Sequence, residues 1–257
     1  MENLLQDIQE SRSTLPTDSI LAIHDIRKST KYLRAVLKLD TAAPISITRS
    51  LQMISRLLAP YRDAHVNVQV YQNLINTGDG LQDQELELRL YQNPYYSDPI
   101  PGALQLEILD NQFIICANCL KSYHPKLTGA RVVDQVEETF RSGIKAFNKV
   151  RKDSGAPVLH SWRKKTKRLW YQLHFLFGEE HTQLIHPVNS SDSLGQSLGE
   201  IHDLDVLRFV LPDESDTQLT RFIQHQREVL LTETVEQGNQ LFIQQNLSFH
   251  QLINQLK

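Results

Sequence analysis

Apolar residues recur along most of the chain at the three- and four-residue spacing that places them on one face of an α-helix. Clusters of proline and glycine, such as the segment 98–101, separate these stretches. Only residues 81–90 alternate with a period of two, and a single strand would have no partner. The pattern predicts an all-α fold of helical bundles. The helices are predicted at residues 17–39, 45–59, 61–76, 102–123, 127–152, 157–178, 195–211 and 215–245.

Two motifs occur twice, in the same order. Residues 23–39 match residues 159–175 at an offset of 136, which equates His24 with His160 and Arg27 with Arg163. Residues 58–66 match residues 198–206 at an offset of 140. Two motifs at nearly the same spacing indicate the duplication of one helical unit. We therefore predict a first domain at residues 1–125 and a second domain at residues 126–257.

The composition excludes several classes of protein. Of the 257 residues, 40% are hydrophobic and 22% are charged, which is typical of globular proteins and not of disordered ones. Two cysteines cannot form a disulfide scaffold and fit a reducing compartment. The first ten residues do not resemble a signal peptide, and no apolar run approaches the roughly 18 residues of a membrane span. We expect a cytoplasmic protein without a membrane partner.

Basic side chains gather on one stripe of each repeated helix. Residues 24–38 and 160–178 together contain ten of the 27 Lys and Arg residues but one acidic residue, Asp25. Exposed helix faces usually alternate acidic and basic residues, because like charges one turn apart repel each other. A bound polyanion would offset that repulsion. The stripes consist of His24, Arg27, Lys28, Lys31, Arg34 and Lys38 in the first helix, and of His160, Arg163, Lys164, Lys167, Tyr171 and His174, with Arg168 at the margin, in the second.

The second motif adds candidate residues beside these stripes. Arg56, Arg62 and His202 extend the basic surface. Asp63 and Asp203 have a structural role in this interpretation. They either cap a helix start or hold basic side chains in place through charge-assisted hydrogen bonds.

The composition of the stripes favours a linear, densely charged ligand without bases. Arginine and lysine bind phosphate oxygens, and histidine adds donors whose charge depends on pH. Binders of single-stranded nucleic acid usually add exposed aromatic side chains for stacking. Tyr171 is the one aromatic residue on a stripe, and Trp162 belongs to the apolar seam, so a nucleic-acid ligand is disfavoured.

At these residues the sequence resembles the CHAD family, the conserved histidine α-helical domain. The pattern H-x-x-R-K-x-x-K occurs at His24–Lys31 and at His160–Lys167, followed by R-D-x-x-V at 62–66 and H-D-x-D-V at 202–206. The resemblance implies two four-helix bundles related by pseudo-two-fold symmetry. It also implies that inorganic polyphosphate binds along a basic central groove, and that the protein associates with polyphosphate granules.

Other chemistry has weaker support. Cys116 and Cys119 have the spacing of half a zinc site, but no second pair follows, so we interpret them as two buried helix cysteines. We find no enzyme signature and expect no catalytic residue, cofactor or metal. A polyphosphate or nucleotide phosphohydrolase using the His and Asp elements, and a single-stranded nucleic-acid binder, remain as alternatives. Residues 215–257 either pack inside the second bundle or mediate a homodimer.

Overall fold

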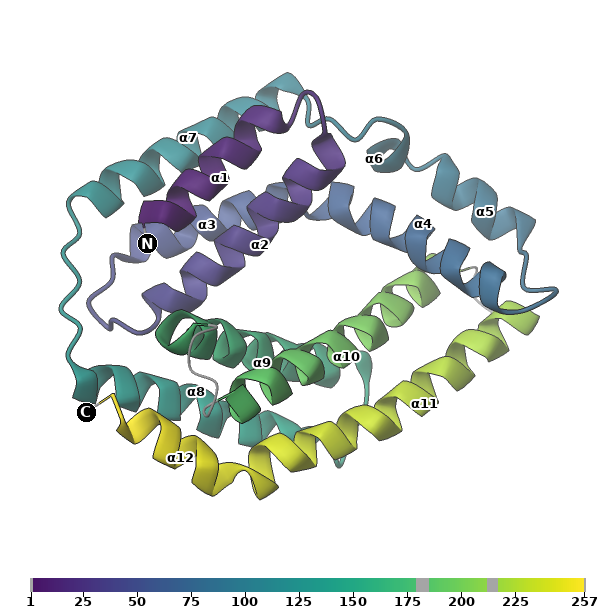
Figure 1. The fold of residues 1–257 in the computed structure, drawn as a ribbon. Helices are drawn as coiled ribbons and strands as arrows, with labels where there is room; N and C mark the ends of the chain where they lie inside the picture. The colour runs from purple at the N-terminus through teal and green to yellow at the C-terminus, as the bar shows by residue number, and fades with distance from the viewer. Residues whose placement is uncertain (1, 179–184, 212–216, 257) are drawn as a thin grey trace. The chain divides into compact units, whose positions relative to one another are not determined.

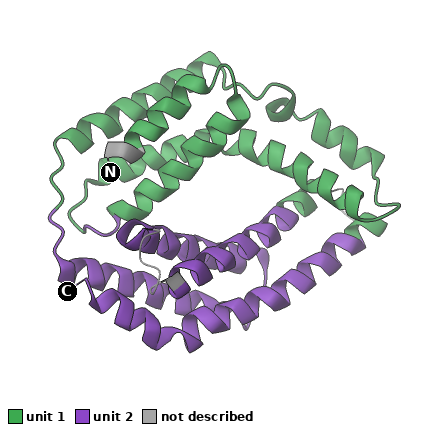
Figure 2. Cartoon of the chain, in the orientation of Figure 1, with its two compact units in different colours: residues 1–37, 41–125, 206–220 green, residues 38–40, 126–205, 221–257 purple. Residues whose placement is uncertain are grey.

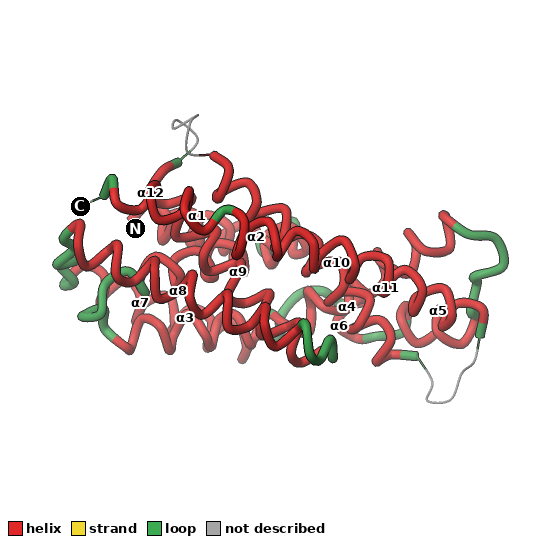
Figure 3. The backbone as a smooth tube through the Cα atoms, turned by 90° about the horizontal axis from the view of Figure 1, so that it is seen from below, coloured by secondary structure: helices red, strands yellow, loops and turns green. Residues whose placement is uncertain are grey.

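The computed structural model describes residues 2–178, 185–211 and 217–256, and these residues form helices joined by short loops (Figures 1 and 3). No strand occurs among them, so the predicted all-α fold is confirmed. The helices are α1 (Glu2–Thr14), α2 (Ser19–Leu37), α3 (Ile45–Leu57), α4 (Ala59–Thr77), α5 (Gln84–Tyr91), α6 (Pro94–Ser97), α7 (Ala103–Lys121), α8 (Gly129–Val150), α9 (Ala156–Phe177), α10 (Ile185–Val210), α11 (Gln218–Asn239), the π-helical turn η1 (Gln240–Gln244) and α12 (Asn246–Asn254).

The predicted helices correspond to observed ones, but the sequence pattern missed α1, α5, α6 and α12. The alternating segment 81–90 contains α5 and no strand. Asp83 caps this helix, because its carboxylate accepts a hydrogen bond from the backbone N–H of Leu86 at 3.0 Å. Leu86 and Leu90 are then one turn apart and both buried, so the leucines satisfy a helical period as well as an alternating one.

Helix α10 begins ten residues before its predicted start at residue 195. The segment 185–194, which contains Pro187 and several serines, lay outside the predicted helices. Proline is compatible with the first turn of a helix, because the N–H groups there have no partner within the helix. The added turns carry Asp192, which contacts the basic stripe of α9.

The chain forms two compact units (Figure 2). Unit 1 comprises residues 1–37, 41–125 and 206–220, and unit 2 comprises residues 38–40, 126–205 and 221–257. The two-domain division at residue 125 and the duplication of a four-helix bundle stay predictions.

Each unit has its own hydrophobic core, and the two cores differ in composition. The core of unit 1 is mainly aliphatic and is built on α1, α2, α3 and α7, with Ile26 and Leu33 among its fully buried residues. The core of unit 2 contains five fully or almost fully buried aromatic rings from α8, α9, η1 and α12. These are Phe140, Phe147, Trp162, Phe242 and Phe249.

Segments near the end of the chain contribute to the core of unit 2. Leu241 and Phe242 from η1, and Phe249, Leu252 and Ile253 from α12, are all buried there. Of the two alternatives for residues 215–257, packing inside the chain therefore holds for this part, and a homodimer stays a prediction. Within the described ranges, we find no helix with the length and apolar character that crossing a bilayer requires.

Candidate anion-binding helices

Helix α2 presents its basic stripe on the side away from its apolar seam. Ile23, Ile26 and Leu33 are buried in the core of unit 1. Because a helix turns about 100° per residue, the residues directly following or preceding these positions point away from the core. The stripe therefore lies at the surface of the unit. His24 and Lys28 are exposed, and Arg27, Lys31 and Arg34 are half-buried.

Arg27 is held against α3. Its Nη1 donates a hydrogen bond to the backbone carbonyl of Ser55, near the end of that helix. The last carbonyls of a helix have no partner inside the helix, and the helix dipole makes that end attractive to a cation. The Ser55 hydroxyl also lies 3.1 Å from the hydroxyl of Thr30, on the next turn of α2. The start of the basic stripe is thus fixed in position by α3.

Two acidic residues lie beside basic residues of unit 1. His24 Nδ1 is 3.1 Å from Asp25 Oδ1, and both side chains are exposed to solvent. Arg62 Nη1 donates to Asp63 Oδ1 at 3.2 Å on α4. The His24–Asp25 pair is exposed, and exposed pairs of this kind are worth about 0–1 kcal/mol. The Arg62 side chain is only 20% exposed, so its pair with Asp63 is partly shielded from solvent.

Helix α9 carries the second stripe on the same kind of scaffold. Leu159, Trp162, Leu169 and Leu173 are buried in the core of unit 2. The side chains of His160, Arg163, Lys167, Arg168 and His174 are half-buried, whereas Lys164 is exposed.

Two glycines of α10 provide the space that the long side chains of α9 occupy. A Cβ atom added at Gly195 would lie 2.7 Å from Lys167 Cδ, and one added at Gly199 would lie 3.4 Å from an Arg163 Nη. Close approach of this kind is possible because glycine has no side chain. Arg163 and Lys167 therefore lie flat along α10, one turn apart on each helix.

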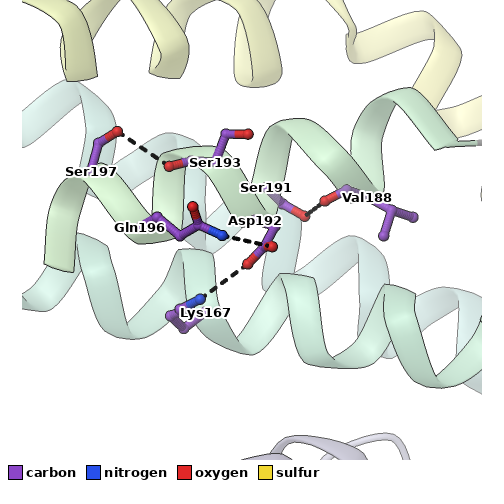
Figure 4. A network of polar contacts seen from close by, with 7 residues as sticks. All are labelled: Lys167, Val188, Ser191, Asp192, Ser193, Gln196 and Ser197. Carbon is purple, nitrogen blue, oxygen red and sulfur yellow. Dashed lines mark hydrogen bonds and ion pairs between the residues drawn. The ribbon is translucent and has the colours of Figure 1, made fainter.

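Lys167 makes two further contacts that hold its ammonium group. Its Nζ donates to Asp192 Oδ1 at 3.1 Å, and Asp192 Oδ2 accepts from Gln196 Nε2 at 3.0 Å (Figure 4). The same Nζ lies 4.4 Å from the centre of the Trp170 ring, within the range of a cation–π interaction. Asp192 thus neutralises one cation of the stripe from a neighbouring helix.

The histidines of unit 2 lie against other rings. The His160 and His202 rings are 4.6 Å apart between centroids, with 31° between their planes. His160 on α9 therefore faces α10 in the same register as Arg163 and Lys167. At the other end of the stripe, His174 stacks on Trp170 with centroids 5.5 Å apart.

Arg168, at the margin of the stripe, lies in a less polar environment. Burial lowers the pKa of its guanidinium, and the carboxylate of Glu138 acts in the opposite direction. Arginine stays charged over the whole physiological range. The positive charge of Arg168 is therefore retained close to the core of unit 2.

Cys116 and Cys119 both lie on α7 of unit 1, where Cys116 is buried and Cys119 half-buried. Burial, with a smaller contribution from Cys119, raises the pKa of the Cys116 thiol to about 11. Metal coordination requires the thiolate, which is scarce at neutral pH when the pKa is this high. Cys116 is a core residue, as interpreted from the sequence.

The predicted residues thus fall into two groups within the units. Unit 1 holds His24, Arg27, Lys28, Lys31 and Arg34 on α2, the exposed Arg56 on α3, and Arg62 and Asp63 on α4. Unit 2 holds Lys38, which follows α2 and is exposed, together with His160, Arg163, Lys164, Lys167, Arg168 and His174 on α9 and His202 and Asp203 on α10. That the two stripes line one groove stays a prediction.

Two details of the sequence interpretation are wrong. Asp203 lies deep inside α10, and Asp63 lies beyond the first turn of α4, so neither caps a helix start. The hydrogen bond between Asp63 and Arg62 fits the second interpretation, in which Asp supports a basic side chain. Tyr171 is buried and is not an exposed member of the stripe, whereas Trp170, which the prediction left out, contacts Lys167.

The residues that position the basic side chains were not predicted from the sequence. Asp192 fell outside the predicted helix, and Ser55 interacts through its backbone. The glycines 195 and 199 lay inside a predicted helix, where glycine is unfavourable by about 1 kcal/mol relative to alanine. Two glycines spaced by one helical turn are a signal that a partner approaches closely, and this signal was available in the sequence.

Comparisons with known proteins agree with the family resemblance. The family model of the CHAD domain matches residues 111–212, which contain the end of α7 and all of α8, α9 and α10. A crystal structure of the CHAD domain from the plant Ricinus communis superimposes with a TM-score of 0.62 and 20% sequence identity. The match covers 96% of this chain and 88% of that chain. No protein with a curated description matches the chain. Residues 111–212 therefore match the CHAD domain family, and nearly the whole chain shares the fold of the plant CHAD domain.

Proposed function

We propose that the protein binds inorganic polyphosphate through the basic stripes of α2 and α9 and does not catalyse a reaction on it. The observation that carries the proposal is the way neighbouring elements hold the basic side chains. Ser55 orients Arg27, and the glycines of α10 seat Arg163 and Lys167. Cations held in place before binding lose less conformational entropy when an anion arrives.

The chemistry of the stripes suits a chain of phosphates. Like charges repeat at one-turn intervals over about 15–20 Å of each helix, given a rise of 1.5 Å per residue. A polyphosphate presents negative charges at short, regular intervals and has no bases to stack. Trp170, beside the stripe of α9, already contacts the Lys167 ammonium and the His174 ring. This favours polyphosphate over a nucleic acid, and we expect the protein to accumulate on polyphosphate granules.

A fourfold variant tests the proposal. Replacing Arg27, Lys31, Arg163 and Lys167 by alanine should abolish binding of polyphosphate, measured by titration calorimetry, while circular dichroism still reports a helical protein. The matched control replaces Lys121, Lys126, Arg131 and Arg141, which are exposed and lie outside the stripes, and removes the same charge. Wild-type affinity in the stripe variant would overturn the proposal.

Salt dependence provides a second readout. Binding should weaken as salt rises, because each phosphate contact releases counterions from the polyanion. The slope of log Kd against log salt should be much smaller in the stripe variant than in the control. Equal slopes would show that binding is nonspecific attraction to basic residues in general.

The alternatives give different results. Incubation with polyphosphate and a divalent cation, scored for released orthophosphate, should show no release above the rate without protein. Release that depends on His160 or Asp203 would indicate a phosphohydrolase. Single-stranded RNA of equal charge should fail to displace polyphosphate. Displacement by RNA at lower concentration would make nucleic acid the ligand.

A further inference from the structure

A second group of basic side chains lies within unit 2, outside the stripes that the sequence singled out. Lys145 and Lys149 are one turn apart on α8, and both are exposed. Lys165 is on α9, which packs along α8. We call these three lysines the α8–α9 patch. Lys165 is two residues before Lys167 and therefore lies roughly 160° around the helix from it.

The charges of the patch are close enough to act on one another. Burial, followed by the positive charges of Lys149, Arg168 and Lys145, lowers the pKa of the Lys165 ammonium. Within residues 2–178, 185–211 and 217–256, none of the three lysines forms an ion pair. The nearest carboxylates on α8 act on other residues, because Glu137 pairs with Arg141 and Glu138 acts on Arg168. The fold therefore maintains a repulsive cluster of cations at its surface.

The patch is continuous with the stripe of α9. Around the helix, Lys164 and Arg168 occupy the positions between Lys167 on one side and Lys165 on the other. Lys164 is exposed and Arg168 is half-buried, so α9 itself carries positive charge from the stripe to Lys165 without an acidic residue of its own, and Glu138 of α8 acts on Arg168. Lys145 and Lys149 then carry this charge from α9 to α8.

We infer that polyphosphate bound on the stripe of α9 continues around that helix onto Lys165, Lys145 and Lys149, so that the patch selects long chains over short ones. This inference rests on the proposed function. A short polyphosphate contacts only the cations of the stripe and does not reach the patch. A longer chain reaches the patch and relieves the repulsion among the three lysines. Each added contact releases further counterions and strengthens binding.

The test compares two chain lengths on one set of variants. The patch variant replaces Lys145, Lys149 and Lys165 by glutamine, which keeps most of the length of the side chain. The control variant replaces the exposed Lys121, Lys126 and Arg131 by glutamine and makes the same change in net charge. Affinities for tripolyphosphate and for a long-chain polyphosphate are measured for both variants, for the fourfold stripe variant and for the unmodified protein, and circular dichroism checks the fold.

We expect the patch variant to bind long chains about tenfold more weakly than the control, as three exposed charge contacts would predict. Its affinity for tripolyphosphate should equal that of the control. The salt slope for long chains should fall by about two, at roughly 0.7 per contact for a flexible single chain.

Three results are distinguishable. Equal affinity of the patch and control variants for long chains would overturn the inference while leaving the proposed function intact. An equal loss for tripolyphosphate and for long chains would show that the patch does not select length, and would also overturn the inference. Binding of long chains that survives removal of the stripe cations but fails in the patch variant would contradict the proposed function itself.

Discussion

Helices α2 and α9 carry the same motif but lie against different neighbours. In unit 1, Arg27 of α2 donates to a backbone carbonyl of α3 at Ser55, close to the break between α3 and α4. In unit 2, Arg163 and Lys167 of α9 lie along the continuous helix α10, where two glycines replace side chains. The first histidine shows the same contrast. His24 is exposed beside Asp25, whereas His160 packs against the His202 ring.

This difference shows that a duplicated motif does not fix the environment of its side chains. In unit 1 a helix end supplies the acceptor, and the acceptor is main chain. In unit 2 the contacts are with Gly195 and Gly199, inside the regular helix α10, and these small residues provide the space between the two helices. The second arrangement depends more on individual side chains and on the register of packing. Substitutions around α9 should therefore have larger effects than equivalent ones around α2.

The largest effect is expected when the cations of one helix are removed. Replacing Arg163 and Lys167 by alanine should weaken polyphosphate binding about 100-fold, since a hydrogen bond to a charged group is worth about 1.5–3 kcal/mol. This change also leaves the Asp192 carboxylate without Lys167. The corresponding variant of Arg27 and Lys31 should weaken binding about 30-fold. Titration at one salt concentration measures both values, and a larger loss from the α2 pair would contradict the comparison.

The next largest effect is expected on the stability of unit 2, when a substitution disturbs the aromatic core on which α9 packs. A Cβ added at Gly238 of α11 would lie 2.6 Å from Trp162 Cζ2 and 2.8 Å from Phe147 Cε2, and both rings are fully buried. Overpacking of this kind costs about 1–3 kcal/mol and outweighs the helix propensity that alanine adds. We expect Gly238→Ala to lower the free energy of unfolding by about 2 kcal/mol.

Urea denaturation followed by tryptophan fluorescence measures this loss, because both tryptophans lie on α9 and report on unit 2. Gly199→Ala on α10 of unit 2 is the control, since its added Cβ would meet the end of the Arg163 side chain at 3.4 Å. An unchanged urea midpoint for Gly238→Ala would mean that the aromatic rings of unit 2 can shift to make room for the methyl group.

Disturbing the contact between Lys167 and Gly195 should have a smaller effect on polyphosphate binding. Gly195→Ala places a methyl group against Lys167 Cδ, so the ammonium has to move and affinity should fall about fivefold. Stability should not fall, because alanine favours the helix by about 1 kcal/mol over glycine. Ser55, which the offset of 140 aligns with Gly195, binds Arg27 through its carbonyl, and Ser55→Ala should bind normally. Normal binding by Gly195→Ala would show that Lys167 needs no fixed position.

The smallest expected effect is an increase in affinity for polyphosphate, whereas the preceding variants should lower affinity or stability. Asp192→Asn removes the carboxylate that lies 3.1 Å from Lys167 Nζ, and it should tighten polyphosphate binding about threefold. The control, Asp134→Asn, makes the same change in charge at an exposed position of α8. Weaker binding by Asp192→Asn would mean that the carboxylate positions Lys167 for the ligand, and that neutralisation is the minor effect.

Much of the fold was predictable from local pattern. The apolar residues of α2 and α9 recur at helical spacing, so the position of each helix and the side on which its basic stripe lies follow from about 100° of rotation per residue. The segment 81–90 shows the limit of this reasoning. Leu86 and Leu90 fit a helical period, Leu88 fits only the alternating one and is exposed, and the cap at Asp83 favours the helix. A period alone does not distinguish helix from strand in so short a segment.

The sequence by itself determined an all-α chain with two basic helices that share one motif, because helical periodicity and like-charge spacing are properties of residues close together in the chain. Tertiary structure alone decided that Lys167 meets Asp192, that Arg163 lies over Gly199 and that Arg27 reaches the carbonyl of Ser55. These partners are 25 to 36 positions apart, and the register in which two helices pack selects them. That register is set by the buried side chains of the whole unit, and no local pattern contains it.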